Sequence, residues 1–287
     1  MFVIRIGTSG WSYEDWAGEF YPRGLSKDKR LEYYARYFHT TEINSTYYSF
    51  PAPSTVKRWI SRASKLDDFE YSLKMPGRVT HESLLLDRDH ALEFEFKVLS
   101  PLQNAGCLGA VLIQLSPYLM LSDKGQKTEH LERLKMLLER LETSQYNYAV
   151  EFRHSSWLEQ GGLNHEALDL LKERGVAVCS VDGPSMPPIM ENTARHAYLR
   201  FHGRNDDIWF KKEPDGGRMN RYDYNYSEEE LAPWRKRVRA LGGTVRVYFN
   251  NHPHANAVRN AKLFESIMGI PGEPLKLERQ SELSSFF

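Results

Sequence analysis

Eight short runs of β-branched and aromatic residues are spread along the whole chain, and helical patterns lie between most of them. Strands are expected at residues 3–7, 41–47, 70–75, 109–115, 148–153, 177–181, 197–202 and 244–249. Helices are expected at 29–38, 54–63, 89–102, 128–141, 164–174, 227–241 and 255–268. Strands that alternate with helices favour a parallel sheet, because each crossover must return the chain to the same end. With no Pro-, Gly- or Ser-rich linker between them, these units predict an α/β fold, a single (β/α)8 TIM barrel.

A doubly wound sheet is the alternative architecture for the same alternation. It needs a glycine-rich turn that leads from the first strand into a helix and binds phosphate. In this chain the turn Gly7-Thr-Ser-Gly10 leads into Trp-Ser-Tyr instead of a helical pattern. Because α/β barrels span roughly 250 residues as one domain, we expect a single domain over residues 1–287, with 280–287 as a C-terminal tail.

Composition excludes several classes of protein. The 38 Lys and Arg residues equal the 38 Asp and Glu residues, which excludes a globally basic nucleic-acid binder but leaves room for a local basic patch. The two cysteines, Cys107 and Cys179, form no zinc-binding or disulfide framework. No stretch approaches the ~18 apolar residues of a membrane helix, and the N-terminus lacks the features of a signal peptide. We therefore expect a soluble, cytoplasmic protein without a membrane partner.

Two helix ends carry capping signals. Ser227 is followed three residues later by Glu230, which is the capping-box pattern of a helix start. Gly175 directly follows the predicted helix 164–174, where a left-handed residue commonly ends a helix.

Polar side chains gather near the ends of the predicted strands. Alternate residues of a barrel strand point inward, and those near its C-terminal end reach the mouth, where the active sites of TIM barrels lie. This alternation assigns the inward face to Glu42, Asn44, Thr46, Lys74, Gln114, Glu151, Arg153, Ser180, Asp182, Arg200, His202, Arg204, Arg246, Tyr248 and Asn250. Cys179 falls on the other face of its strand and is interpreted as a packed thiol.

Two interpretations of these buried charges remain open. Burying a charge is costly unless it is paired or meets a ligand. A structural ion-pair network, for example Glu42 with Lys74 or Glu151 with Arg153, would satisfy them internally. The convergence of the whole set on one mouth favours a binding or catalytic site instead.

Six segments carry a resemblance to a known family: GTSGWSYEDWAGEFYP at 7–22, TTEINSTYYSFP at 40–51, KMPGRVTHE at 74–82, VEFRHSSW at 150–157, YLRFHGR at 198–204 and YFNNHPHANAVRNA at 248–261. In this order and over nearly the whole chain they resemble the domain of unknown function 72 family (YecE-like proteins). The resemblance implies a TIM-barrel fold. It supplies no established reaction, so no catalytic role is carried over from it.

The first candidate constellation is basic and consists of Lys74, Arg153, Arg200 and Arg204. Arginine matches phosphate and carboxylate groups with two parallel hydrogen bonds, so a small anionic or phosphorylated ligand is expected. Aromatic residues such as Trp11 lie in the same loops and suit a base or sugar ring. Trp16 and Tyr47 are expected to cap the barrel core.

The second candidate constellation is acidic and consists of Glu42, Glu151 and Asp182, together with His202. Carboxylates and a histidine at strand ends can bind a divalent metal, and Glu151, Asp182 and His202 are the candidate ligands. Without a metal, Glu151 or Asp182 would be a general base and His202 a general acid, while Lys74 and Arg200 stabilise negative charge.

The loop after the last predicted strand supplies Asn250, Asn251 and His252, which are expected to bind the ligand together with Asn44, Gln114 and Tyr248. The helix 255–268 begins just after this loop, and its N-terminus is suited to an anion. Phosphate is frequently held by the loops after the seventh and eighth strands of TIM barrels.

The leading hypothesis is an enzyme that acts on a phosphorylated or other anionic substrate by hydrolysis or acid–base chemistry at the barrel mouth. The second is a nucleic-acid-binding protein with endonuclease IV-like activity, and the third is a non-catalytic ligand-binding barrel. The sequence names neither the substrate nor the oligomeric state.

Overall fold

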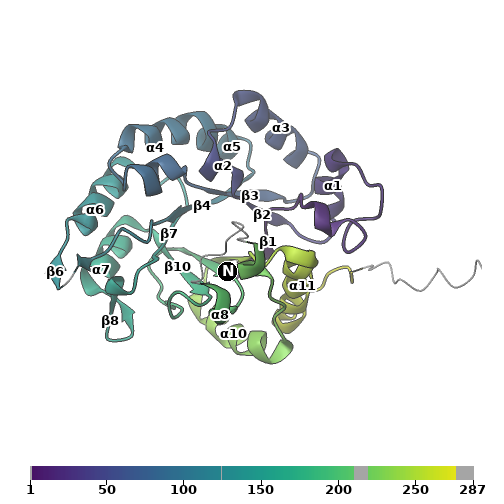
Figure 1. Ribbon diagram of the computed structural model, residues 1–287. Helices are drawn as coiled ribbons and strands as arrows, with labels where there is room; N and C mark the ends of the chain where they lie inside the picture. The colour runs from purple at the N-terminus through teal and green to yellow at the C-terminus, as the bar shows by residue number, and fades with distance from the viewer. Residues whose placement is uncertain (1, 124, 210–218, 276–287) are drawn as a thin grey trace, which may run out of the picture.

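Eight parallel strands close into a barrel in the part of the chain that the computed structural model describes, residues 2–123, 125–209 and 219–275 (Figure 1). Around the barrel the order is β1-β12-β11-β10-β7-β4-β3-β2. The strands are β1 Val3–Ser9, β2 Thr40–Ile43, β3 Glu70–Lys74, β4 Leu108–Gln114, β7 Tyr148–Glu151, β10 Ala177–Asp182, β11 His196–Phe201 and β12 Thr244–Phe249. The predicted (β/α)8 barrel is thereby confirmed, and the predicted tail 280–287 lies outside the described residues.

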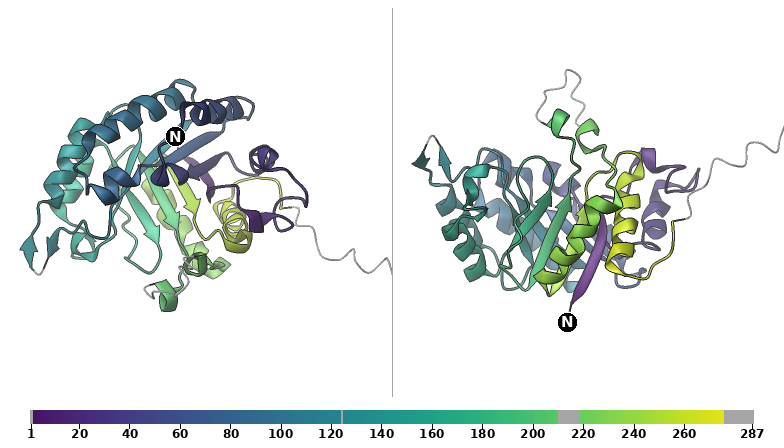
Figure 2. Two further views of the ribbon diagram at one scale, coloured as in Figure 1. Left: turned by 45° about the horizontal axis from the view of Figure 1, so that its top comes forward. Right: turned by 90° about the horizontal axis from the view of Figure 1, so that it is seen from below.

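Helices surround the barrel on its outside (Figures 1 and 2). They are α1 Arg30–Tyr34, α3 Pro53–Ala63, α4 Arg88–Phe94, α5 Ser100–Asn104, α6 His130–Arg140, α7 His165–Arg174, α10 Glu228–Leu241 and α11 Asn256–Met268. The predicted helix 89–102 is divided into α4, a π-helical turn η4 (Glu95–Leu99) and α5. None of the described helices is long and apolar enough to span a membrane.

Short elements lie in the connections. They are the helical turns η1 Glu14–Trp16, η2 Lys27–Lys29, α2 Ser45–Tyr48, η3 Arg78–Glu82, η5 Ser155–Trp157, α8 Asp206–Trp209, α9 Met219–Tyr222 and η6 Pro253–Ala255, and the two-stranded ribbons β5 Ser122–Asp123 with β6 Gln126–Lys127 and β8 Leu158–Glu159 with β9 Gly162–Leu163. In the right-hand view of Figure 2, α8 and α9 rise above the end of the barrel opposite the N-terminus. This end is the mouth.

Both predicted helix caps are present. The Ser227 side chain accepts a hydrogen bond from the Glu230 backbone, and the Glu230 side chain accepts one from the Ser227 backbone, which completes the capping box of α10. Gly175 ends α7 in the left-handed conformation at φ 62°. At the other end of α7, the Asn164 side chain accepts bonds from two backbone N–H groups.

The barrel interior is layered. Its middle is a small apolar cluster of Ala110, Leu112, Ala149, Ala177, Cys179, Val181, Tyr198 and Tyr248. Towards the N-terminal end, Arg246 donates to both oxygens of Glu70, at 2.7 and 3.0 Å. Arg246 therefore lies at the end of the barrel opposite the mouth, which corrects its predicted place. The outward strand faces join the helices in a larger core that includes Val111 and Leu199.

Two strands differ from the prediction in a way that changes the site. Strand β2 ends at Ile43, and the chain turns into α2 because Asn44 already has helical backbone angles. Thr46 consequently lies in a helical turn, where its hydroxyl donates to the Lys74 carbonyl at 2.5 Å. In β10 the inward face carries Cys179 and Val181, so Asp182 lies on the outward face, opposite to the prediction.

Candidate functional site

Arg200 of β11 occupies the centre of the barrel just below the mouth. Its guanidinium donates to Glu42 Oε1 of β2 at 2.8 Å and to Glu151 Oε2 of β7 at 2.7 Å. All three side chains are at most 2% exposed. The strand alternation correctly predicted that these groups face inward. The pairing itself was not predicted: Glu42 was a candidate for catalysis or for a pair with Lys74, and Arg200 a candidate for holding a ligand anion.

Each buried carboxylate has further hydrogen-bond donors. Ser9 Oγ and the Tyr198 hydroxyl donate to Glu42 at 2.7 and 2.6 Å. Gln114 Nε2 donates to Glu151 Oε1 at 2.7 Å. Burial alone would raise the pKa of Glu151, but attraction to Arg200 outweighs it and holds that pKa well below its usual range. Both carboxylates are therefore ionised at neutral pH, since the pKa of Glu42 is lowered by the same balance.

His202 lies beside Glu151 and is uncharged. Asn250 Nδ2 lies 3.0 Å from its Nδ1, and its Nε2 lies 3.6 Å from Glu151 Oε1 and 3.5 Å from Arg200 Nη1. Burial, followed by the positive charge of Arg200, lowers the pKa of His202. A neutral imidazole beside a carboxylate can accept or donate a proton.

Lys74 is the cation of the mouth that lacks a carboxylate partner. It ends β3, and its Nζ lies 4.0 Å from the centroid of the Tyr47 ring. Within the described part of the chain it forms no ion pair and no hydrogen bond through Nζ. Burial, followed by repulsion from Arg200, lowers the pKa of Lys74 to about 7.

Arg153 and His81 complete the surroundings of Lys74. Arg153 makes one long contact, 3.5 Å from Nη1 to Glu151 Oε1, and its side chain is 20% exposed. The His81 ring meets the Tyr47 ring edge-to-face with centroids 4.9 Å apart. Burial, followed by the charges of Lys74 and Arg153, lowers the pKa of His81 to about 4, so the imidazole is neutral. Tyr47 was expected to cap the core. Its side chain is only half-buried, and the Lys74 ammonium lies over the face of its ring.

Arg204 and Asp182 form a separate pair, which corrects the predicted role of both. Arg204 donates to the two Asp182 oxygens at 2.8 and 2.7 Å and to Glu230 at 3.3 Å. The Tyr226 hydroxyl also donates to Asp182, at 2.8 Å. Arg204 is thus engaged and not a free anion-binding group. Asp182 reaches neither Glu151 nor His202 because it lies on the outer face of β10.

The candidate metal ligands Glu151, Asp182 and His202 are therefore not brought together. No group of three or more His, Cys, Asp or Glu side chains among the described residues has an arrangement that could hold a metal ion. Glu151 already receives donors from Arg200, Gln114 and Arg153.

Two further predicted ligand-binding residues, Tyr248 and Asn251, have structural contacts. The Tyr248 hydroxyl lies in the middle of the barrel, hydrogen-bonded with Thr40 and Ser72 at 2.6 and 2.7 Å. Asn251 is fully buried and donates to the Tyr224 carbonyl and to Asn260, so it fixes the loop after β12. These two predictions are corrected by their burial.

The remaining predicted residues lie at the mouth or beside it. His252 stacks on Tyr13 with ring centroids 4.5 Å apart, and its Nδ1 is buried without a partner among the described residues. The side-chain oxygen of Asn44 is likewise buried without a hydrogen-bond partner among the described residues. Trp11 is partly buried against the core. Trp16 is fully buried, as predicted, and donates to the His252 carbonyl.

A carboxylate of the chain lies at the turn before α11, near the expected anion site. The backbone N–H of His254, in the turn that precedes the helix, donates to the Asp15 carboxylate at 2.8 Å. A carboxylate of the chain itself therefore occupies this helix start, and an external anion would meet a like charge there.

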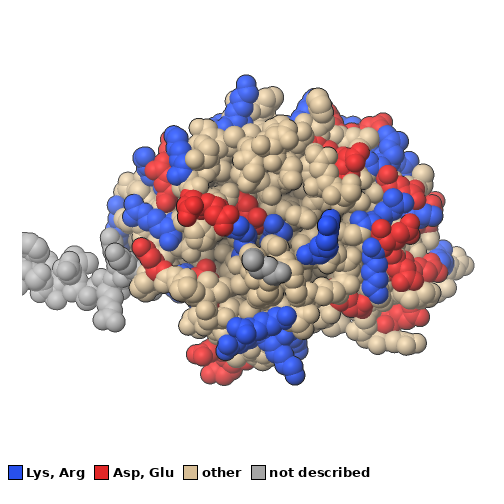
Figure 3. All heavy atoms as spheres, turned by 180° about the vertical axis from the view of Figure 1, so that it is seen from behind, with Lys and Arg blue, Asp and Glu red and all other residues tan. Residues whose placement is uncertain are grey.

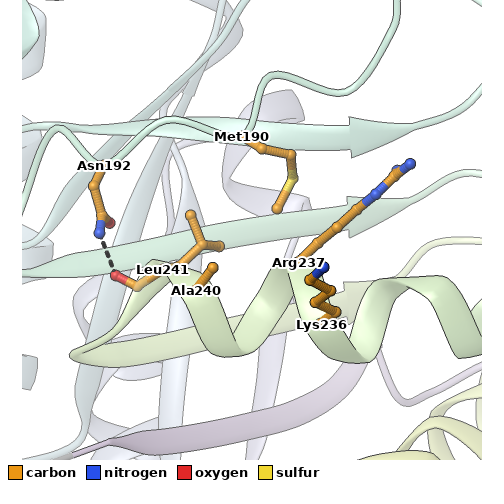
Figure 4. Close-up of a pocket in the computed structure, with 6 residues that line it drawn as sticks. All are labelled: Met190, Asn192, Lys236, Arg237, Ala240 and Leu241. Atoms are coloured by element: carbon orange, nitrogen blue, oxygen red, sulfur yellow. Dashed lines mark hydrogen bonds between the residues drawn. The ribbon is translucent and has the colours of Figure 1, made fainter.

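A groove of about 350 Å³ lies away from these residues, against α10 (Figure 4). It is lined by Met190, Asn192, Lys236, Arg237, Ala240 and Leu241. The Asn192 amide donates to the Leu241 carbonyl at its edge. The groove holds no carboxylate or histidine, so the titratable groups that can transfer protons remain those of the mouth.

Comparisons with known proteins agree with the barrel. The model of the family described as "Protein of unknown function DUF72" matches residues 5–283. The UPF0759 protein YunF of Bacillus subtilis is 28% identical over 284 residues, which cover 93% of this chain and 95% of that protein. A crystal structure of a DUF72 family protein from Thermotoga maritima has a TM-score of 0.79 and 32% identity, covering 93% of this chain and 99% of that one. The UPF0759 protein YecE of Escherichia coli (strain K12) is 27% identical over 73% of this chain and 80% of its own length.

Proposed function

The chain belongs to the DUF72 family of proteins of unknown function, and we propose that it is an enzyme that binds a small anionic substrate at the barrel mouth and acts on it by acid–base chemistry. The observation that carries this proposal is Lys74. It is a half-buried cation at a strand end that no carboxylate of the described residues neutralises. A buried charge without a partner is costly, and a bound anion would remove that cost.

Arg153 is the second cation that the proposed substrate would meet. One nitrogen of its guanidinium contacts Glu151 at 3.5 Å, and among the described residues no other hydrogen bond or ion pair holds this partly exposed side chain. A guanidinium offers five N–H donors, so most of them stay available for a phosphate or carboxylate group. Lys74 and Arg153 therefore supply the anion-binding part of the site, whereas Arg200 and Arg204 do not.

Proton transfer is assigned to His202 and Glu151. One nitrogen of the neutral imidazole is hydrogen-bonded with Asn250, and the other lies 3.6 Å from Glu151. Arg200 and Glu42 act as positioning residues, because they hold Glu151 ionised and fixed below the mouth. This arrangement suits abstraction or donation of a proton and also hydrolysis of an ester, in which a water molecule must lose a proton.

Binding of inorganic phosphate and of small phosphorylated sugars tests the proposal. We expect 10 mM phosphate, roughly 100 times an assumed Kd, to stabilise the protein by about 2.7 kcal/mol, seen as a rise in melting temperature at low ionic strength. Lys74→Met and Arg153→Gln should each reduce this rise strongly. The matched control is Lys236→Met, which removes a lysine from the outer groove. Stabilisation that is equal in all four proteins would overturn the proposal.

The nucleic-acid-binding alternative with endonuclease IV-like activity has less support from the site. Two of the four basic residues on which it rests, Arg200 and Arg204, are engaged by carboxylates of the chain. Binding to DNA that weakens steeply with salt and is lost in Arg153→Gln would favour it over a small-molecule substrate.

A further inference from the structure

We propose that Lys74 is a nucleophilic lysine whose amine forms a Schiff base with a carbonyl group of the anionic substrate. This inference rests on the proposed function and deepens it, because it adds a carbonyl group to the anionic group already assigned. It is carried by the position of Lys74, by its lack of a partner and by the groups around it.

The position places the amine where a substrate can reach it. Lys74 is the last residue of β3, and the residues two and four before it, Ser72 and Glu70, both face the barrel interior. The side chain therefore extends from the interior face into the mouth. The Nζ lies over the face of the Tyr47 ring, 4.0 Å from its centroid, so a ring and not a carboxylate holds the amine in place.

The missing partner distinguishes Lys74 from a structural lysine of the same chain. Lys262 of α11 is also largely buried, with a side chain 13% exposed, and its ammonium pairs with Glu265 at 2.5 Å. Near Lys74 the two available carboxylates, Glu42 and Glu151, both bind Arg200 instead. An ammonium that was needed only for stability would be expected to take one of them.

The surrounding charges favour the neutral amine, which is the nucleophilic form. Burial is the largest cause of the lowered pKa of Lys74, and Arg200 and Arg153 act in the same direction. Glu151 and Glu42 oppose them, and the resulting pKa is about 7. About half of the Lys74 side chains are then unprotonated at neutral pH, compared with well under 1% for an ordinary lysine. The imidazole of His81, which contacts the Tyr47 ring, is neutral and adds no positive charge.

The chemical step balances without a cofactor. The Nζ lone pair attacks the carbonyl carbon to form a C–N bond, while the C=O π pair moves to oxygen and takes a proton. The nitrogen loses a proton, giving a neutral carbinolamine. Protonation of its hydroxyl then releases water, and the nitrogen lone pair forms the C=N bond of a cationic imine. Overall, one amine, one carbonyl compound and one proton give one iminium ion and one water. His81 and the His202–Glu151 pair are the neutral and anionic groups available to carry these protons.

Reductive trapping tests the inference. The probe pair is glycolaldehyde phosphate and glycolaldehyde, which differ only in the anionic group. Each is incubated with the protein and sodium cyanoborohydride, and the reduced adduct is located by peptide mass spectrometry. We expect one adduct per chain on Lys74, formed at least tenfold faster with the phosphate than with glycolaldehyde. The rate should rise with a midpoint near pH 7, because this is the pKa of Lys74.

Three variants give the controls. Lys74→Arg keeps the positive charge and removes the reactive amine, so it should abolish the adduct while the circular dichroism spectrum stays unchanged. Arg153→Gln should remove the preference for the phosphorylated probe. Lys57→Arg, at an exposed position of α3, should leave the adduct unaffected.

The outcomes separate this inference from the proposed function. If phosphate stabilises the protein through Lys74 and Arg153 but no adduct forms on Lys74, the Schiff-base inference is wrong and the anionic substrate stands. If phosphate does not bind either, the proposed function fails as well. Labelling spread evenly over exposed lysines, with rates that keep rising towards pH 10, would also overturn the inference.

Discussion

At the scale of single residues, the Arg200 centre determines how the site is built. One guanidinium binds two buried carboxylates, and Arg153 makes one long contact with Glu151, whereas Lys74 forms no ion pair among the described residues. The network therefore combines both interpretations of the buried charges. Below the mouth, Arg200 is paired with carboxylates of the chain. At the mouth, Lys74 and Arg153 have N–H groups that no carboxylate of the described residues uses fully. Pairing of this kind fixes where Glu151 lies before a substrate arrives.

Arg200→Met should destabilise the protein strongly. The substitution leaves Glu42 and Glu151 buried without their common cation, and removing one partner of a buried ion pair costs about 3–5 kcal/mol. Urea unfolding at pH 7 measures the free energy of unfolding. The control is Arg62→Met, because the partner of Arg62, Asp28, has a side chain that is 87% exposed. Exposed pairs contribute about 0–1 kcal/mol, so similar losses in both variants would contradict the central role of Arg200.

Lys74 should make stability depend on pH in the alkaline range. Its pKa is lowered from 10.5 to about 7, so between these values the unfolded chain binds more protons at this residue than the folded chain. Stability from this group therefore rises with pH over that window. We expect the free energy of unfolding of the wild type, relative to Lys74→Met, to increase by on the order of 2 kcal/mol from pH 7 to pH 10.

The measurement is urea unfolding of both proteins at several pH values. Taking the difference cancels the titration of the many tyrosines that both share. Lys57→Met serves as the comparison for an exposed lysine and should give a difference that does not change with pH. A flat difference for Lys74→Met as well would mean that Lys74 is not buried as the structure describes.

At the scale of secondary-structure elements, the sequence located the strands better than it oriented them. All eight barrel strands were found, because β-rich runs and helical patterns alternate along the chain. Strand β10 was oriented wrongly. Its sequence, AVCSVD, has apolar residues on both faces, so the alternation alone does not decide which face is inward. The two polar residues, Ser180 and Asp182, suggested the mouth, but both face the helices.

Which side chains pair with one another could not be predicted from sequence patterns, for a different reason. Alternation gives the direction of a side chain but not its partner across the barrel. Glu42, Glu151 and Arg200 come from three strands that the closed topology brings together, at sequence separations of 49 and 158 residues from Arg200. The stop of β2 at Ile43 was missed because STYY reads as a strand, although it folds as the turn α2. That turn places Tyr47 under Lys74.

At the scale of the whole molecule, zero net charge is an average over two different distributions. Seen from the side of the N-terminus, Lys and Arg lie intermixed with Asp and Glu over the surface (Figure 3). Exposed ion pairs elsewhere on the molecule include Lys27 with Glu14 and Lys127 with Glu166. The mouth, in contrast, offers Lys74 and Arg153 with donors that no carboxylate uses fully. Composition therefore excluded a globally basic protein without addressing this local site.

Added salt should affect the exposed surface pairs and the cations of the mouth differently. Exposed pairs are each worth about 0–1 kcal/mol and mixed signs largely cancel, so raising NaCl from 0.05 to 0.5 M should change the free energy of unfolding by under ~1 kcal/mol. Phosphate binding at the mouth relies on two cations and should weaken severalfold over the same range. Urea unfolding and calorimetric titration with phosphate, each at both salt concentrations, measure the two effects. Binding that loses about a thousandfold in this range would instead indicate a polyanion site of many contacts, as for nucleic acid. Binding that does not respond to salt would mean that Lys74 and Arg153 do not hold the anion.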